Sequence, residues 1–409
     1  MTGIKPDLAW RASERYARAA LSFVAEPADL ALGAALRLCG ARRVLDCVLS
    51  DGDPEVLAGC WPAMPERGSA EGATADTARG DARLSAAAAG RMVERSRSRR
   101  SALPSPARIE AWQRDGYRLV CPGEPEWPTQ LDDLGDARPI VLWLRGTADL
   151  RFACLRSVSI VGSRAATSYG SVVGTELAAD LAARAFAVIS GGAYGIDACA
   201  HRGALSAGGS TVAVLASGLT FGYPKGHAEL FAAVGQTGVM VSERPPDHAP
   251  TRPGFLVRNR LIAALSRGTV VVEAALRSGA LNTARQAAEL NRPIMAVPGP
   301  VTSAQSAGCH DLIRECGAVC VTSAADVAEV IAPLGELGPD DFGPAVPAEQ
   351  LDPVTASVLT VMTGRVGRGP ATIAVLAGVD LDTAMRCLGL LAAAGYVERC
   401  DKGWRAKRR

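Results

Sequence analysis

The chain has 409 residues, enough for two or three domains with a sizeable buried core, and its 44 basic and 42 acidic residues leave a net charge of +2 that says little about partners. Its 11 cysteines form no C-x-x-C pair, which argues against a zinc site or a disulfide framework and favours a reducing cytoplasm. The charged N-terminal residues and the lack of an apolar run near roughly 18 residues argue against a secretory signal and a membrane span. We therefore expect a cytoplasmic protein with no metal and no membrane partner.

Residues 1–61 are predicted to form a small helical domain, because alanine and leucine recur at helical spacing over 13–25, 28–38 and 42–49. Residues 62–106 are mostly alanine, glycine, serine and arginine, a composition that buries too little apolar surface to fold alone. We interpret them as a linker or insertion. The segment ends in a run of arginines that is either a solvated helix face or a nucleic-acid contact.

Residues 107–333 contain short apolar runs without strict alternation, separated by segments of helical pattern. This arrangement predicts a parallel sheet that is buried on both faces. The expected strands are 139–144, 158–161, 187–190, 211–215, 238–242, 269–273 and 294–297, and the expected helices include 168–185 and 196–207. The predicted fold class is therefore α/β, with a Rossmann-like parallel sheet as its core and ligands at the carboxyl ends of the strands.

Residues 334–350 are rich in proline, glycine and aspartate and are predicted to be a second linker. Residues 351–409 have three helical patterns followed by a hairpin pattern, which is typical of a winged-helix domain. The expected helices are 352–362, 371–376 and 381–394. Five residues of the third helix are expected to face the core: Leu381, Ala384, Met385, Leu388 and Leu391. Arg386 is then its only base, which favours partner binding or weak DNA contact over sequence-specific readout.

Small, polar and basic residues follow the predicted strands and open the next helices in four places. These groups are Gly162, Ser163 and Arg164; Ser190, Gly191, Gly192 and Gly195; Arg258, Asn259 and Arg260; and Ser278 and Gly279. Glycine lets the backbone approach a ligand, arginine offers a fork for a phosphate, and free N–H groups at a helix start form an anion site. The pattern G-x-G-x-x-G is absent, which argues against a dinucleotide, and we expect no cofactor.

In their order along the chain and in their residue types, these groups resemble the DNA-processing protein A family, also called DprA or Smf. The resemblance runs through Val161-Gly162-Ser163-Arg164, Ser190-Gly191-x-Ala193-x-Gly195-Ile196-Asp197, Tyr223-Pro224, Ser242-Glu243, Phe255-x-x-Arg258-Asn259-Arg260, Val272-Glu273-Ala274, Ser278-Gly279-x-Leu281 and Val297-Pro298-Gly299. It implies a cytoplasmic protein, not an established enzyme, that binds single-stranded DNA, protects incoming strands in natural transformation and loads the RecA recombinase. The N-terminal helices are compatible with the family's sterile-alpha-motif-like domain, and the C-terminal pattern is similar to its winged helix.

Carried over to this sequence, the family's DNA pocket would comprise the four groups above and Lys225. Phe255 or Tyr194 would offer a face on which bases stack. The resemblance also implies a homodimer, for which we expect Leu312 and Ile313 to form the interface.

Three positions depart from the family's pattern. Tyr194 stands where a basic residue is usual, and His227 and His310 stand where asparagine is usual. Four other residues near the strand ends have structural roles in our interpretation: Asp197 braces its helix, Glu273 pairs with Arg258 or Arg260, Asn259 satisfies buried backbone, and His201 packs in the core.

Two other functions remain open. One is a nucleotide-binding enzyme like the phosphoribohydrolases of the same Rossmann-like group, which carry a Pro-Gly-Gly-x-Gly-Thr turn with a nearby glutamate. Here the turn reads Pro298-Gly299-Pro300-Val301 and lacks the second glycine and the acid. The other is a regulator that acts through the winged helix, which the scarcity of basic residues on the third helix disfavours.

Overall fold

The computed structural model describes residues 13–50, 86–331, 351–362, 367–393, 396–400 and 403–406. The chain divides into two compact units, Met1–Ile331 and Ala332–Arg409. Within the described residues, no helix is both long and apolar enough to cross a membrane. The same ranges contain no group of three or more His, Cys, Asp or Glu side chains that could hold a metal ion.

The centre of the first unit is a nine-stranded sheet with the order β1-β2-β6-β5-β4-β3-β7-β8-β9. Strands β3 to β9 pair in parallel, whereas β1 and β2 pair antiparallel at one edge. The strands are β1 (Arg118–Val120), β2 (Leu142–Gly146), β3 (Ser157–Val161), β4 (Ala187–Ser190), β5 (Thr211–Leu215), β6 (Val239–Ser242), β7 (Thr269–Val271), β8 (Ile294–Ala296) and β9 (Val319–Cys320). The prediction of a mainly parallel sheet is confirmed, because every predicted run overlaps an observed strand.

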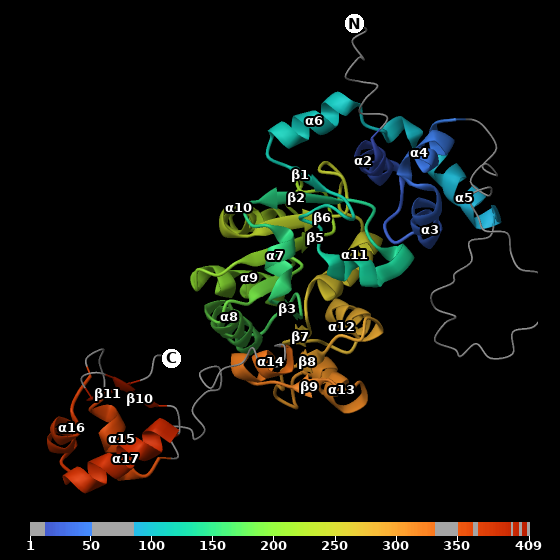
Figure 1. Cartoon of the computed structure of the whole chain (residues 1–409). Helices are drawn as coiled ribbons and strands as arrows, with labels where there is room; N and C mark the ends of the chain where they lie inside the picture. Colours follow the sequence, from blue (N-terminus) through green and yellow to red (C-terminus); the bar gives the residue numbers. More distant parts are fainter. Residues whose placement is uncertain are drawn as a thin grey trace, which may run out of the picture. The chain divides into compact units, whose positions relative to one another are not determined.

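Helices cover both faces of this sheet. On one face lie α8 (Ser168–Ala183), α9 (Ile196–Ser206) and α10 (Ala228–Thr237), and on the other lie α11 (Arg252–Leu265), α12 (Gly279–Glu289) and α13 (Ala307–Glu315) (Figure 1). Two further helices are α7 (Leu150–Leu155) and α14 (Ala324–Ile331). Because both faces are covered, the central strands are buried along their whole length, as in β5. The strand order reverses between β3 and β7, and such a switch point opens a crevice at the carboxyl edge.

The N-terminal helices pack onto the sheet and share its core. They are α2 (Glu14–Val24), α3 (Leu30–Cys39), α4 (Ala41–Leu49), α5 (Ala86–Arg97) and α6 (Pro106–Arg114), with short 3-10 segments at Arg100–Ala102 and Thr129–Ala137. The Phe23 ring lies 5.7 Å from that of Trp112, and Trp112 lies 5.7 Å from Trp143 of β2. Of the predicted linker 62–106, residues 62–85 lie outside the described residues, whereas α5 buries Met92 and Val93 in this core.

The described residues of the second unit form three helices and an antiparallel hairpin. These are α15 (Pro353–Thr360), α16 (Pro370–Ala377), α17 (Leu381–Ala393), β10 (Val397–Cys400) and β11 (Gly403–Ala406). On α17 the buried residues are Ala384, Cys387, Leu388 and Leu391. The predicted inward stripe is wrong for Leu381 and Met385, which are 50% and 45% exposed, because the buried stripe runs through Cys387 and leaves their flank of the helix in solvent.

Candidate nucleic-acid interface

Two glycine turns meet at the carboxyl edge of the sheet, at the switch point. The N–H of Ser163 donates to the carbonyl of Glu273 at 2.7 Å, and the N–H of Ile196 donates to the carbonyl of Ser163 at 3.1 Å. Gly195 has a φ of +77°, and a Cβ there would lie 2.2 Å from the Ser163 oxygen. A Cβ on Gly162 would lie 2.6 Å from Ile196 Cγ1. These glycines are therefore needed for the turns after β3 and β4 to pack against each other.

Arg258 of α11 links the carboxyl ends of β4 and β5 through hydrogen bonds to their backbone. Its Nη1 donates to the carbonyl of Gly191 at 2.6 Å and to the carbonyl of Val214. Burial lowers the pKa of Arg258 to about 10, against the opposing effect of the Asp197 carboxylate. A Cβ on Gly191 would lie 2.3 Å from Nη1 of Arg258, so only glycine fits beside this guanidinium.

A second buried cation, Arg260, pairs with Glu243 at the end of β6. Its Nη2 lies 2.7 and 2.8 Å from the two carboxylate oxygens, and both side chains are buried. Glu273 instead accepts from the N–H and the hydroxyl of Thr167, at 2.9 and 2.6 Å. The prediction that Glu273 pairs with Arg258 or Arg260 is therefore wrong. Glu273 follows β7, where the start of α8 reaches it first, whereas Glu243 follows β6 and faces α11.

Two other predicted site residues, Asn259 and Ser278, and the buried Asp197 also support the backbone. Asn259 donates from Nδ2 to the carbonyl of Gly279 at 3.2 Å, which confirms its expected bond to backbone. The Ser278 hydroxyl accepts from the N–H of Ala280 at 3.2 Å and so caps α12. Asp197 is buried and accepts from the N–H of Ala193 at 3.2 Å. Burial raises the pKa of Asp197, although Arg258 and this hydrogen bond oppose the rise.

The exposed part of the site is a group of rings and cations that we call the aromatic edge. It comprises Arg164, Tyr194, Phe221, Tyr223, Lys225 and Phe255. The Arg164 guanidinium lies 5.1 Å from the centre of the Phe255 ring, and that ring lies 5.6 Å from the Tyr223 ring. Tyr194 and Tyr223 are 52% and 48% exposed. Sequence reasoning missed Phe221 as a candidate and saw Tyr223 only as part of a motif. The clustering of aromatics between Tyr194 and Phe255, in a chain with few of them, was the available signal.

His227 and His310, which the resemblance marks as departures from the family's pattern, each bond to a backbone carbonyl. Nδ1 of His227 lies 3.0 Å from the carbonyl of Gly192, and Nε2 of His310 lies 3.0 Å from the carbonyl of Gly299. A carbonyl only accepts, so each ring nitrogen carries a proton and does what an asparagine amide would do. The His227 ring also supports Tyr194, whose ring lies 4.6 Å away in an edge-to-face arrangement.

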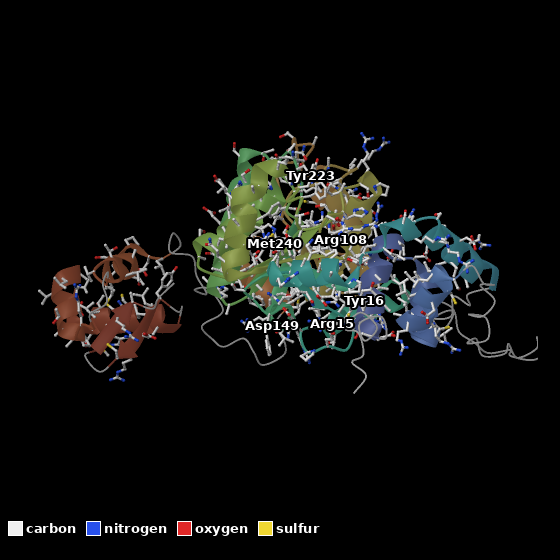
Figure 2. The ribbon with its side chains drawn as sticks, turned by 90° about the horizontal axis from the view of Figure 1, so that it is seen from above. Arg15, Tyr16, Arg108, Asp149, Tyr223 and Met240 are labelled. Carbon is white, nitrogen blue, oxygen red and sulfur yellow. The ribbon has the colours of Figure 1, made fainter. Side chains whose placement is uncertain are left out.

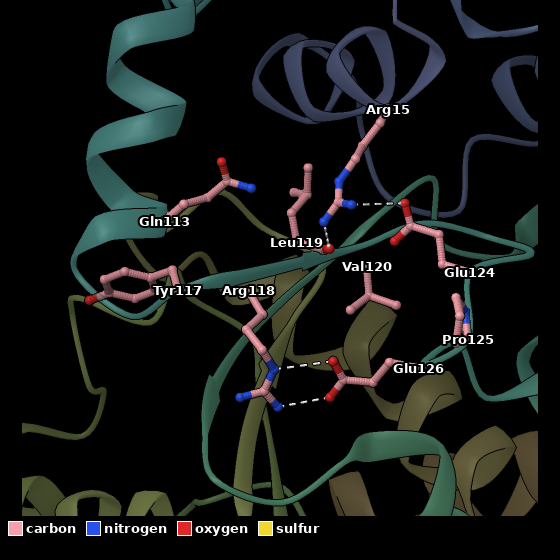
Figure 3. Close-up of a pocket in the computed structure, with 9 residues that line it drawn as sticks. All are labelled: Arg15, Gln113, Tyr117, Arg118, Leu119, Val120, Glu124, Pro125 and Glu126. Carbon is pink, nitrogen blue, oxygen red and sulfur yellow. Dashed lines mark hydrogen bonds and ion pairs between the residues drawn. The ribbon is translucent and has the colours of Figure 1, made fainter.

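A separate hollow lies elsewhere on the first unit, and its charged side chains are already paired. It has a volume of about 630 Å³ and lies against β1. Its two arginines are already paired, Arg15 with Glu124 at 3.3 Å and Arg118 with Glu126 at 2.8 Å (Figure 3). Arg15 and Tyr223 lie on opposite sides of the first unit (Figure 2), so this hollow is separate from the aromatic edge.

These features define a doubly wound α/β protein with an aromatic and cationic surface at the carboxyl edge of its sheet. Residues 118–332 match the sequence model of the family described as DNA recombination-mediator protein A, and the chain belongs to this family. The chain is 44% identical over 311 residues to a putative DNA processing protein DprA of Mycobacterium tuberculosis, covering 73% of this chain and 79% of that protein. It is 40% identical over 202 residues to the DNA processing protein DprA of Streptococcus pneumoniae, covering 49% and 70%. The X-ray structure of DNA processing protein A (DprA) from S. pneumoniae superposes with a TM-score of 0.54 at 33% identity, covering 60% of this chain and 84% of that one.

His201 is packed in the core, as expected, and is a source of acid sensitivity. Its Nδ1 lies 2.7 Å from the Thr211 hydroxyl, which in turn donates to the carbonyl of Val188 at 2.7 Å. Burial lowers the pKa of His201 to about 3 from its ordinary value of 6.5. The unfolded chain therefore binds a proton at this residue below about pH 6.5, whereas the folded chain does so only near pH 3.

We expect His201→Gln to remove this part of the acid sensitivity. Protonation of the unfolded state destabilises the wild type as pH falls below 6.5, by about 1.4 kcal/mol per pH unit at this single residue. Urea unfolding at neutral and mildly acidic pH measures the effect. The free energy of unfolding of the wild type should drop more on acidification than that of the variant, and equal drops would contradict the assignment.

Proposed function

We propose that this protein binds single-stranded DNA at the aromatic edge, protects incoming strands in natural transformation and loads the RecA recombinase onto them. The observation that carries the proposal is the Arg164 guanidinium against the Phe255 ring, beside the exposed ring of Tyr223. A single strand presents phosphates and unpaired bases together, and a cation beside open rings suits both. A duplex hides its base faces and could use only the cation.

Backbone amides add a second place for phosphate. α9 begins at Ile196 after the turn that contains Tyr194 and Gly195. In the part of the chain that the structure describes, neither N–H of these two residues has an acceptor. Both lie at the positive end of the helix dipole, where anions are stabilised. Lys225, exposed on the neighbouring turn, adds a charge.

The remaining predicted contact residues fit a supporting role better than a direct one. Arg258 and Arg260 are buried and engaged inside the protein, and Asn259 bonds to backbone. We propose that these residues keep the turns in place while Arg164, Lys225 and the rings contact the strand. RecA loading is supported by the family's description as a DNA recombination mediator.

We expect Arg164→Ala and Phe255→Ala each to weaken binding of a single strand by roughly 1–3 kcal/mol, for different reasons. Loss of the Arg164 charge should also reduce the dependence of affinity on salt, by about 0.7 in the slope of log K against log salt for one phosphate contact. Loss of the Phe255 ring should leave that slope unchanged. Fluorescence anisotropy with a labelled oligothymidine over a salt series measures both quantities.

The matched control is Arg151→Ala, which removes an exposed arginine from α7. Because α7 directly precedes β3, it lies near the amino ends of the strands and away from the aromatic edge at their carboxyl ends. Its affinity should equal that of the wild type. Equal affinity of the wild type for single strands and duplex would contradict the proposal. Hydrolysis of nucleoside monophosphates by the purified protein would favour the phosphoribohydrolase-like alternative.

We propose a homodimer across the β9 edge of the sheet, supported by the family resemblance. Val319 of β9 is 44% exposed, and Ile313 of the neighbouring α13 is only partly buried. Leu312, the other residue predicted for the interface, is 3% exposed and lies in the core, because its side chain points from α13 toward the sheet. The edge of β9 carries unpaired backbone groups that a second copy would satisfy.

Val319→Arg and Ile313→Arg are expected to give a monomer, because a charge buried at an apolar interface is unfavourable. Light scattering measures the mass of each variant. Phe152→Arg changes an exposed apolar residue on α7 in the same way and should leave the mass as in the wild type. If both edge variants keep the mass of the wild type, the interface lies elsewhere.

The second unit is proposed to be a winged helix that adds nonspecific affinity or binds a partner. Its three helices and hairpin have the required order. On α17 Arg386 is the only base, and the exposed Leu381 and Met385 suit a protein surface better than a DNA groove. Basic residues gather instead in the tail of the chain, and of these Arg405 is described, whereas Lys402, Lys407, Arg408 and Arg409 lie outside the described residues.

We therefore expect a chain cut before Gly335 to remain folded and to bind single strands less than about tenfold more weakly, because backbone contacts by a basic tail add affinity without specificity. Circular dichroism and anisotropy check folding and binding. Retention of binding with loss of RecA loading would identify the second unit as the partner surface. Aggregation, or complete loss of binding, would show that the unit is integral to the site.

A further inference from the structure

The segment from Arg244 to His248 connects the N-terminal helices to the aromatic edge. On its N-terminal side, Nη2 of Arg244 donates to the carboxylate of Glu26, in the loop after α2, at 2.9 Å. Three residues later, Asp247 pairs with Arg108 of α6. The N-terminal helices therefore hold both ends of the Pro245-Pro246 pair, which has no N–H of its own to bond elsewhere.

The same segment holds the turn that carries the aromatic edge. The carbonyl of Pro246 accepts from the N–H of Thr220 at 2.9 Å and from its hydroxyl at 2.6 Å. The carbonyl of His248 accepts from the N–H of Gly218 at 2.8 Å. A Cβ on Gly218 would lie 2.1 Å from the Pro245 oxygen, so the two backbones are in direct contact. Phe221 follows Thr220 directly, and a shift of the segment would move the ring.

Charge and burial fix the position of the connection. The Arg244 side chain is only 12% exposed, and Glu26 also pairs with Arg99. Burial alone would raise the pKa of Glu26, but the bonds from Arg244 and Arg99 outweigh it and lower that pKa. A cavity of about 10 Å³ is lined by Pro27, Arg244, Glu243 and Arg258. The loop after α2 therefore lies close to the buried charges that support the glycine turns.

We propose that Glu26 and Arg108 are positioning residues for single-stranded DNA. They act through Arg244 and Asp247 to hold the turn that places Phe221 and Tyr223 on the surface. This inference rests on the proposed function of the aromatic edge. It gives the N-terminal helices a role in DNA binding that needs no contact between these helices and the strand.

The sign of the effect distinguishes this role from simple electrostatics. Glu26 and Asp247 carry negative charges on the side of the molecule proposed to bind an anion, so by charge alone their removal would strengthen binding. We expect Glu26→Gln and Asp247→Asn to weaken binding of an oligothymidine about threefold to tenfold, the range for residues that modulate a site without touching its ligand. The salt dependence should stay as in the wild type, because no phosphate contact is lost.

Hydrogen exchange of the 216–223 peptide without DNA tests the connection by itself. The N–H of Thr220 should exchange faster in both variants, because its acceptor is the carbonyl of Pro246. The matched control is Asp136→Asn, which removes a negative charge from the ion pair of Arg37 in α3 with Asp136 at 2.9 Å, a link between α3 and the 3-10 segment Thr129–Ala137. That variant should change neither the exchange nor the affinity.

A double-mutant cycle of Glu26→Gln with Arg244→Gln should show non-additive losses, because the two residues act through one bond. Affinity that is unchanged or increased in Glu26→Gln and Asp247→Asn, with a wild type that binds single strands, overturns this inference alone. A wild type that does not bind single strands overturns the proposed function and the inference with it, even where the exchange result confirms the connection. Asp247 is 40% exposed, so its variant stays informative should Glu26→Gln fail to fold.

Discussion

The site depends on the hydrogen bonds that the buried guanidinium of Arg258 donates to backbone carbonyls. A buried cation is costly unless its hydrogen bonds and a counter-charge compensate for lost hydration. Here the carbonyls of Gly191 and Val214 accept its protons, and Asp197 supplies the opposite charge. Because these partners come from β4, β5 and the start of α9, one side chain sets the relative position of three elements.

Close packing around Arg258 explains why glycine is needed in these turns better than the approach of a ligand does. Gly191 faces the guanidinium, and Gly195 faces the carbonyl of Ser163, and in both places a Cβ would overlap an atom of the protein itself. A glycine-rich turn at the start of a helix is usually interpreted as an anion site. In the turn Gly191–Gly195, glycine is needed first because the protein packs closely against the backbone. The open N–H groups of Tyr194 and Gly195 result from this packing.

The sequence was sufficient to predict the sheet, because strands buried on both faces are continuous apolar runs that stand out between helical patterns. It could not separate Arg164 from Arg258 and Arg260, since all three are arginines in motifs near strand ends. Their difference is burial, which depends on how α11 lies against β3, β4 and β5. The choice of Glu243 over Glu273 as the partner of Arg260 likewise depends on the position of α11 in space and not on spacing in the chain.

The division between buried and exposed cations also bears on the kind of binding that this surface can support. Arg260 is paired with Glu243, and the Asp197 carboxylate opposes the charge of Arg258, so these buried cations add little net field at the surface. The exposed cations of the aromatic edge are Arg164 and Lys225, beside the four rings of Tyr194, Phe221, Tyr223 and Phe255. Rings therefore make up a larger share of this surface than charges do. Base stacking is tolerant of sequence and does not release counterions, so a surface of this composition should keep more of its affinity at high salt than one built from arginine and lysine alone.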